Sequence, residues 1–238
     1  MVLTKNNLKV GKMKKRVEEY LASFSGCVGG NIKADTWIVG IEYGRDITKT
    51  DLLERLKEYE TVAPKGYAAD YVSKSKFDEG LKKLLSVVEN ISEDKLNSIF
   101  SINDSDHFRI NIYPIPFKNV SSWNDEFNDI LEVKSKAEYY EKCREVRFPF
   151  FKEVIRNNKP KVSLCFGTTM TDDYLRLLCD SSFKYFTKKI MNKKILVATN
   201  FNRIVVVCPF LRSISGLNSN VEIETFAEEI KKIKKMIF

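Results

Sequence analysis

Histidine is almost absent from this chain of 238 residues, since His107 is the only one. Five cysteines occur, but their number is odd and no two of them form a Cys-x-x-Cys pair. We therefore expect no histidine-rich metal site, no Ser-His-Asp triad and no tetrahedral zinc site built from cysteines. The cysteine pattern also argues against a framework of disulfides.

Long apolar runs are also missing, and none approaches the roughly 18 residues that a membrane-spanning helix needs. The N-terminal segment is rich in lysine but has no apolar stretch before a small-residue cleavage site, so it does not read as a signal peptide. We expect a cytoplasmic protein with no membrane partner. With 43% hydrophobic residues, the chain is long enough for one large domain with a buried core.

The glycine-rich motifs that hold nucleotide phosphates are absent. Neither Gly-x-Gly-x-x-Gly nor Gly-x-x-x-x-Gly-Lys-[Ser/Thr] occurs, so we expect no dinucleotide or other organic cofactor. A nucleophile elbow is missing too, and this disfavours an unrelated α/β hydrolase or transferase acting on a small molecule. That class remains the third possibility.

Charge is unbalanced, because 40 basic residues face 32 acidic ones and give a net charge of +8. Such an excess favours a polyanionic partner such as DNA. Lysine-rich composition also serves solubility, so charge alone favours nucleic acid only slightly.

Apolar runs typical of strands alternate with segments of helical periodicity. Strands are expected near residues 34–41, 107–113 and 161–166, and a hairpin is expected over 194–208. This alternation predicts an α/β protein, a three-layer α/β/α arrangement with a mainly parallel sheet of four to five strands. We expect a single domain over residues 1–238, with a helical insertion at about 48–103.

The loops that leave these strands carry the candidate site, because ligands of open α/β sheets bind outside the carboxyl ends of the strands. The first loop is Gly40-Ile41-Glu42-Tyr43-Gly44, and Glu42 is its only carboxylate. The second strand ends near Asn111, and the third ends at Gly167. The last strand is followed by Ser213-Ile214-Ser215-Gly216-Leu217.

These strand ends together resemble the uracil-DNA glycosylase superfamily over roughly residues 35–220. Members of that family have a strand leading into a Gly-x-[Asp/Asn]-Pro-[Gly/Tyr] loop, and a second strand that ends in an asparagine near a proline. They also have a late loop of the form [His/Asn]-Pro-Ser-x-Leu. The corresponding segments here are Gly40–Gly44, Asn111 with Pro114, and Ser213–Leu217.

Two positions depart from the family pattern. Tyr43 stands where the first loop usually has proline, and Ser213 with Ile214 replaces the His-Pro or Asn-Pro pair of the late loop. The resemblance thus implies a glycosylase-like fold more directly than it implies the activity.

The activity implied by the resemblance is hydrolysis of the N-glycosidic bond of a deaminated or modified base in DNA, without a metal or cofactor. Glu42 stands where the family has an Asp or Asn that orients water and stabilises the sugar cation. A glutamate that caps a helix N-terminus is an equally weighted interpretation. Asn111 matches the asparagine that reads uracil, and the alternative is an asparagine that binds local backbone.

Further contacts are expected around these two residues. Ser213 replaces the histidine that stabilises the leaving base, and because serine carries no charge it would be the weaker stabiliser, with Arg212 as the nearest cation. The flipped base would stack on an aromatic side chain, and DNA phosphates would meet the polar loops. Core packing and ordinary solvated loops are the competing interpretations. The expected substrate-binding residues are Gly40, Tyr43, Gly44, Arg45, Asn111, Tyr113, Phe117, Arg212, Ser215, Gly216 and Asn218.

The missing His-Pro or Asn-Pro element also supports a different function. A catalytically inactive relative would keep the fold and the basic surface, and would bind nucleic acid or a protein partner through the same pocket. Binding that falls steeply with salt, without release of a base, is the behaviour expected of such a protein.

Overall fold

The structure is a computed structural model that describes residues 5–68, 73, 75–96, 100 and 106–238, and the side chains from residue 13 onward. The chain divides into two compact units. The first, here called the helical unit, comprises Met1–Cys27, Glu42–Pro64 and Asn111–Asn157. The second, the sheet unit, comprises Val28–Ile41, Lys65–Ile110 and Asn158–Phe238.

The helical unit is formed by helices whose apolar faces pack together. Thr48 begins one of them with a capping box, in which its side chain accepts from the Asp51 backbone and the Asp51 carboxylate accepts in return. The expected long helix over 135–157 is present and contains Pro149. The elements are α1 (Lys5–Leu21), α2 (Lys49–Lys57), η2 (Asp125–Phe127), α4 (Asn128–Leu131) and α5 (Lys136–Asn158).

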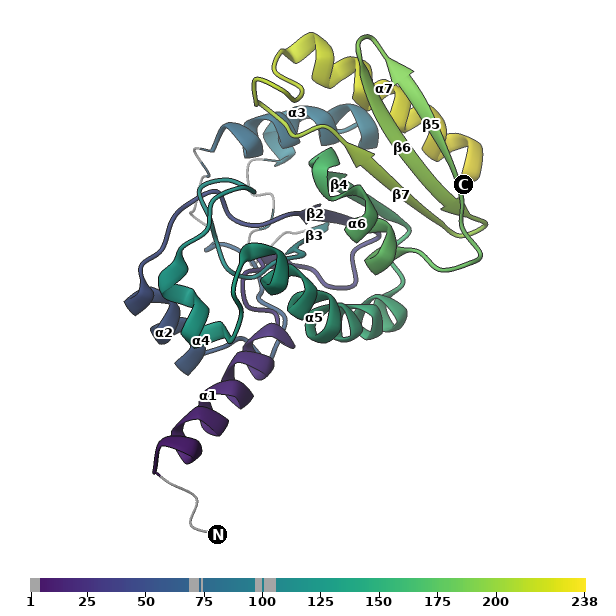
Figure 1. Cartoon of the computed structure of the whole chain (residues 1–238). Helices are drawn as coiled ribbons and strands as arrows, with labels where there is room; N and C mark the ends of the chain where they lie inside the picture. The colour runs from purple at the N-terminus through teal and green to yellow at the C-terminus, as the bar shows by residue number, and fades with distance from the viewer. Residues whose placement is uncertain (1–4, 69–72, 74, 97–99, 101–105) are drawn as a thin grey trace. The chain divides into compact units, whose positions relative to one another are not determined.

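The sheet unit is built on a seven-stranded sheet with the order β1-β3-β2-β4-β7-β6-β5 (Figure 1). The central strands β2, β4 and β7 are parallel, and all or nearly all of their residues are buried. This explains their continuous hydrophobic sequences, because such strands are covered on both faces. The strands are β1 (Gly29–Gly30), β2 (Thr36–Gly40), β3 (His107–Asn111), β4 (Val162–Phe166), β5 (Lys184–Ile190), β6 (Lys193–Asn200) and β7 (Arg203–Cys208).

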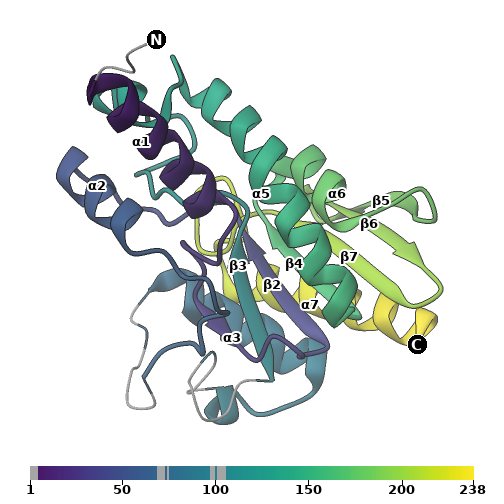
Figure 2. The same ribbon diagram turned by 90° about the horizontal axis from the view of Figure 1, so that it is seen from below.

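Helices cover both faces of this sheet. α3 (Lys76–Glu89) and α7 (Asn220–Ile237) pack against each other on one face, and α6 (Thr171–Leu178) lies on the other, against β7 (Figure 2). Two 3₁₀ turns complete the unit, η1 (Glu93–Leu96) and η3 (Thr168–Met170). Ser219 and Glu222 form the capping box that begins α7.

The α/β class is confirmed, but the sheet differs from the one expected. It has seven strands and is mixed, because β1 pairs antiparallel with β3 at one edge and β5 and β6 are antiparallel at the other. β5 was not predicted from the sequence, because six of its seven residues are exposed and no apolar pattern indicates a strand there. Of the expected insertion at about 48–103, α2 belongs to the helical unit and α3 to the sheet unit, while residues 69–72, 74, 97–99 and 101–103 lie outside the described part.

Candidate active site

Glu42 lies two residues beyond the end of β2, in the helical unit, where its carboxylate is paired with Lys136. Glu42 Oε1 lies 2.9 Å from Lys136 Nζ, and only 4% and 9% of the two side chains are exposed. Lys136 is the first residue of α5 and is 94 positions away in the sequence, so no local pattern indicated this partner. The pair is a buried ion pair, not a helix cap.

Lys136 is held by three further groups besides the carboxylate. Its ammonium donates to the Asn119 carbonyl at 3.1 Å and lies 4.0 Å from the centre of the Phe117 ring. The Tyr140 ring is 5.4 Å away. An ammonium over an aromatic face is attracted by the ring quadrupole, so these contacts favour the charged lysine inside the protein.

Burial raises the pKa of Glu42 from 4.5 to about 7, although the hydrogen bond and charge of Lys136 oppose that shift. Burial likewise lowers the pKa of Lys136, against the effect of Glu42. A hydrogen bond from Tyr140 also lowers the pKa of Glu42. Oε2 of Glu42 is buried.

This arrangement has a chemical consequence, because a carboxylate with a pKa near 7 exchanges its proton close to neutral pH. General bases work best when their pKa lies near the operating pH. Oε1 is paired with Lys136 and Oε2 is buried, so another molecule can reach this carboxylate only if the surrounding side chains move. Perturbed carboxylates of this kind are typical of functional sites and also occur in structural ion pairs.

After Glu42 the first loop runs to the surface at Gly44 and Arg45. The Tyr43 carbonyl accepts from the backbone N–H groups of Phe117 and Arg45, and this fixes the course of the loop. Gly44 is exposed, and a Cβ there would lie 4.0 Å from the nearest atom. Arg45 is exposed beside a shallow cavity of about 360 Å³ whose other charged residues are Asp46, Asp51, Glu54 and Arg55. The cavity contains more carboxylates than guanidinium groups, which does not favour a phosphate.

Asn111 is not placed to read a base. Its residue is 1% exposed, and its Nδ2 donates to the Gly26 carbonyl at 2.8 Å. The amide therefore supports the backbone of the N-terminal segment, which agrees with the alternative interpretation of this residue.

Tyr113 and Phe117 are buried as well and do not offer a free aromatic face. Tyr113 is 0% exposed and stacks on Tyr140 with ring centres 4.0 Å apart. Phe117 is 2% exposed, with Lys136 against its ring and Trp123 at 5.4 Å. Phe117 lies directly against Lys136 and Tyr113 lies against Tyr140, so stacking on a flipped base would require both rings to move.

Arg147 is a buried cation that no sequence motif indicated. The residue is 0% exposed and lies in α5. Its guanidinium donates to the carbonyl oxygens of Leu21, Ser23, Ser25 and Asn111 at 2.9–3.2 Å. The run of aromatic residues that follows it, Phe148 to Phe151, was the only signal that this part of α5 is buried.

The sheet unit carries the remaining candidates, beginning with Gly40 at the buried end of β2. In the loop after β7, Ser213 is partly exposed, but its Oγ is buried and has no partner among the described residues. Ser215 and Asn218 are exposed. A Cβ on Gly216 would lie 1.8 Å from the Phe210 carbonyl oxygen, so the fold of this loop requires glycine here.

Arg212 serves the structure of the same loop. Its backbone has φ 55°, and its guanidinium donates to the Asn218 carbonyl and to the Asn220 side chain. These bonds tie the loop to the beginning of α7, while Nε is buried without a partner among the described residues. The predicted site residues are thus divided, with Glu42, Tyr43, Gly44, Arg45, Asn111, Tyr113 and Phe117 in the helical unit and Gly40, Arg212, Ser213, Ser215, Gly216 and Asn218 in the sheet unit.

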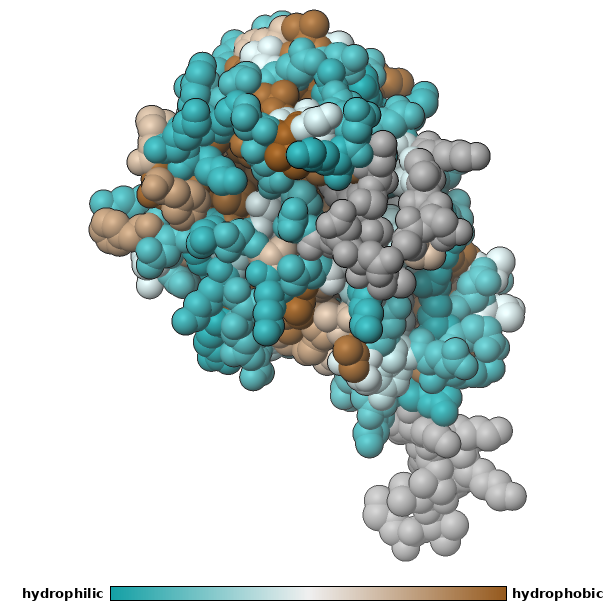
Figure 3. Space-filling view, turned by 180° about the vertical axis from the view of Figure 1, so that it is seen from behind, coloured by the Kyte–Doolittle hydropathy of each residue, from teal (hydrophilic) through white to brown (hydrophobic). Residues whose placement is uncertain are grey.

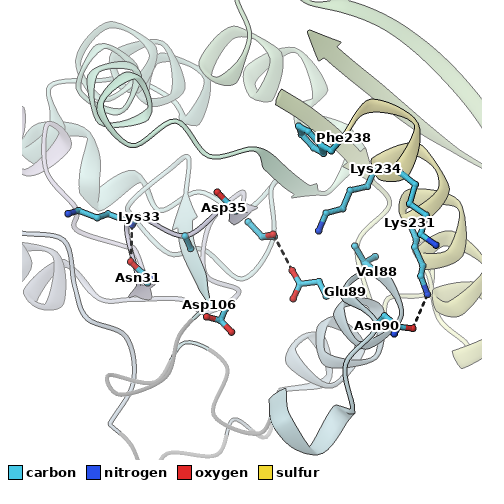
Figure 4. A pocket seen from close by; sticks show the side chains of 13 residues that line it. Asn31, Lys33, Asp35, Val88, Glu89, Asn90, Asp106, Lys231, Lys234 and Phe238 are labelled. Carbon is cyan, nitrogen blue, oxygen red and sulfur yellow. Dashed lines mark hydrogen bonds between the residues drawn. The ribbon is translucent and has the colours of Figure 1, made fainter. Parts of the chain in front are cut away.

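A cavity of about 900 Å³ lies in the sheet unit, at the amino end of β2 (Figure 4). Its floor contains Glu89, whose carboxylate accepts from Thr36 Oγ1 at 3.1 Å and contacts Nε2 of the buried His107 at 3.0 Å. Lys234 extends from α7 toward this carboxylate. Burial raises the pKa of Glu89, but His107, Thr36 and Lys234 together leave it below the ordinary value. The cavity thus lies away from the carboxyl strand ends that carry Gly40 and Ser213.

Within the described residues, no group of three or more histidine, cysteine, aspartate or glutamate side chains is arranged to hold a metal ion. The five cysteines are free thiols, four of them buried. No helix in the described part of the chain is both long and apolar enough to span a membrane. Compared with known proteins, the sequence matches no protein-family model and no curated protein.

Proposed function

We propose that this protein hydrolyses the N-glycosidic bond of a deaminated or modified base in DNA, in the manner of the uracil-DNA glycosylases it resembles. The observation that carries the proposal is Glu42, a buried carboxylate with a pKa of about 7 in the loop that follows a central strand. The net charge of +8 suits a polyanionic substrate.

The fold is consistent with this proposal. The central strands have the order β3-β2-β4-β7, so the chain reverses its direction of winding between β2 and β4. In open α/β sheets, ligands bind at such a reversal, outside the carboxyl ends of the strands. We propose that the layered sheet unit is the glycosylase-like part of the fold, with β5 and β6 as additions to it.

The proposed reaction requires the buried Glu42 carboxylate to be opened to water. Ionised Glu42 then accepts a proton from a water molecule, and the water oxygen bonds to the anomeric carbon of the sugar. The C–N bond breaks and its electron pair leaves with the base, which takes a proton from solvent. Lys136 holds Oε1, so it fixes the orientation of the carboxylate and keeps part of it ionised at neutral pH. Ser213, Arg212 and the other residues predicted to contact substrate remain predictions.

The test is release of base from labelled single- and double-stranded DNA that contains uracil, hypoxanthine or other deaminated bases. Wild type is compared with Glu42→Gln, which keeps the shape of the side chain and removes its basicity. Loss of release by a still-folded Glu42→Gln protein supports the proposal. Equal release by both proteins, or no release by wild type at high concentration, overturns it.

A catalytically inactive relative that binds nucleic acid or a protein partner is the second candidate. The burial of Glu42, Asn111, Tyr113 and Phe117 favours it, because none of these side chains is offered to a ligand. Binding to the same DNA panel without release of any base, equal for wild type and Glu42→Gln, is the expected behaviour. In that case the Glu42–Lys136 pair is a structural ion pair.

A further inference from the structure

The hairpin formed by β5 and β6 concentrates positive charge and exposed aromatic side chains. From Lys184 to Lys194 the sequence Lys-Tyr-Phe-Thr-Lys-Lys-Ile-Met-Asn-Lys-Lys holds five lysines and no carboxylate. Tyr185 is 65% exposed and Phe186 is 45% exposed. β5 is the last strand of the sheet, so one of its edges is unpaired. The face drawn in Figure 3 is mainly hydrophilic, with hydrophobic residues in small separate groups.

The two faces of the hairpin differ in their charge balance. Residues at alternate positions of a strand share a face, and so do residues directly opposite each other. On one face, Lys188 and Lys193 form ion pairs with Glu229 and Glu222 of α7. The charges of this face are therefore largely compensated by the helix beneath it.

The other face, here called the open face, consists of Tyr185, Thr187 and Lys189 of β5 with Lys194, Leu196 and the buried Ala198 of β6. Lys189 lies directly opposite Lys194, and both are exposed. Neither forms an ion pair with the described residues. Like charges directly opposite each other destabilise a sheet, so this pair weakens the hairpin unless an anion lies against it.

Aromatic and basic side chains on one face can bind different parts of the same ligand. Tyr185 lies four residues from Lys189, about 13 Å along the strand, so a single extended ligand can reach both. A base stacks on an aromatic ring whatever its identity, while lysines attract the phosphates beside it. In a paired duplex the bases are stacked on each other and cannot reach such a ring. An acidic peptide would contact the lysines but has no base to stack on Tyr185.

We propose that the open face of the β5–β6 hairpin binds single-stranded nucleic acid, with phosphates at Lys189 and Lys194 and a base on Tyr185. This proposal does not involve Glu42 and does not depend on the proposed glycosylase activity. A protein without glycosylase activity would still bind here, so the two proposals fail independently.

The test is fluorescence anisotropy of the whole protein with a labelled 20-residue oligothymidylate and with a duplex of equal length. Lys189→Gln/Lys194→Gln is compared with Lys232→Gln/Lys235→Gln, which removes the same charge from exposed positions of α7. We expect the hairpin variant to bind at least tenfold more weakly and to lower the slope of log K against log salt by about 1.4. The α7 variant should change affinity by less than about twofold.

The stacking contact has its own comparison. Tyr185→Ala should weaken binding by about tenfold, whereas Phe201→Ala, at a 97% exposed ring in the turn between β6 and β7, should not. Removing the opposed lysines should leave the melting temperature unchanged or raise it, so weaker binding cannot be ascribed to unfolding. The proposal is wrong if wild type does not bind, if the duplex binds more tightly than the single strand, or if the hairpin and α7 variants lose affinity equally.

Discussion

Glu42 and Lys136 lie 2.9 Å apart within the helical unit, and both are almost completely removed from solvent. Their pKa values are displaced toward each other, because burial raises that of the acid and lowers that of the base. Burial therefore disfavours the charged form of both groups, while their contact with each other favours it. The charge state of the pair depends on pH in a range where ordinary glutamate and lysine do not titrate.

The first prediction concerns stability against pH. The pKa of Glu42 is higher in the folded protein than its ordinary 4.5, so the folded state binds more protons between pH 4.5 and 7. As pH rises from 4.5 to 7, the free energy of unfolding should fall by about 1–3 kcal/mol because of this group. Urea denaturation of wild type and Glu42→Gln at pH 5 and pH 7.5 measures it. If the stability difference between the two pH values is the same in both proteins, Glu42 is not its source.

The second prediction concerns the coupling of the pair. Lys136→Met should destabilise the protein by about 3 kcal/mol at pH 8, because it leaves a buried carboxylate without its cation. Glu42→Gln/Lys136→Met should recover most of that loss, since neither charge then remains buried. A double-mutant cycle from denaturant unfolding gives the coupling energy. Losses that simply add would show that the two side chains do not stabilise each other.

For Arg147 we expect a large effect from a single substitution. Arg147→Met removes the donor shared by four buried carbonyl groups and should destabilise the protein by about 3 kcal/mol or more. Arg156→Met, at an exposed position of the same helix, should change stability by less than about 0.5 kcal/mol. Thermal unfolding of the two variants provides the comparison, and similar melting temperatures would refute the assigned role.

Replacement by alanine should reduce the stability of the protein at one glycine of the helical unit and leave it unchanged at another. Gly26 has φ 77°, and a Cβ there would lie 2.6 Å from Pro114 backbone atoms, so Gly26→Ala should cost about 1–3 kcal/mol. Gly44 is exposed, with the nearest atom 4.0 Å from its Cβ position, and Gly44→Ala should be nearly neutral. The urea midpoints of the two variants are compared with that of wild type. A destabilised Gly44→Ala protein would show that the loop needs a backbone conformation that alanine does not readily adopt.

Glu89 should contribute to the loss of folding stability at low pH. Its pKa is lowered in the folded state, so its stabilising contribution is present above pH 4.5 and is lost as pH falls through the folded value. The groups that face it are His107 on β3, Thr36 on β2 and Lys234 on α7. Glu89→Gln should be less stable than wild type at pH 6, and the difference should shrink below pH 4.5. Melting temperatures between pH 3 and 6 test this, and a constant difference would contradict it.

The strongly patterned parts of the fold were predictable from the sequence. The strands β2, β4 and β7 are continuous hydrophobic runs because they are buried on both faces, and α7 has a regular apolar face. β5 could not be recognised, since its exposed lysines obey no burial pattern. The two-residue strand β1 is too short to have one.

The candidate site was only partly predictable. Glu42 was found because it is a lone carboxylate in a strand-end loop, but its partner Lys136 is 94 positions away and lies in an ordinary helical pattern. The buried amide of Asn111 is satisfied by the Gly26 carbonyl, which is 85 positions away. Contacts at such separations depend on the tertiary fold, and no local motif records them.

The bonds made by Arg147 also restrict the order in which the chain acquires its structure. Three of its carbonyl partners precede it by 122–126 positions, so during synthesis they emerge long before the guanidinium that they bind. The carbonyl groups of Ser23 and Ser25 therefore cannot form these hydrogen bonds until α5 has been synthesised. Contacts of such long range slow folding and leave partly formed states exposed to aggregation. We expect nascent chains that end before residue 147 to hold this segment unfolded.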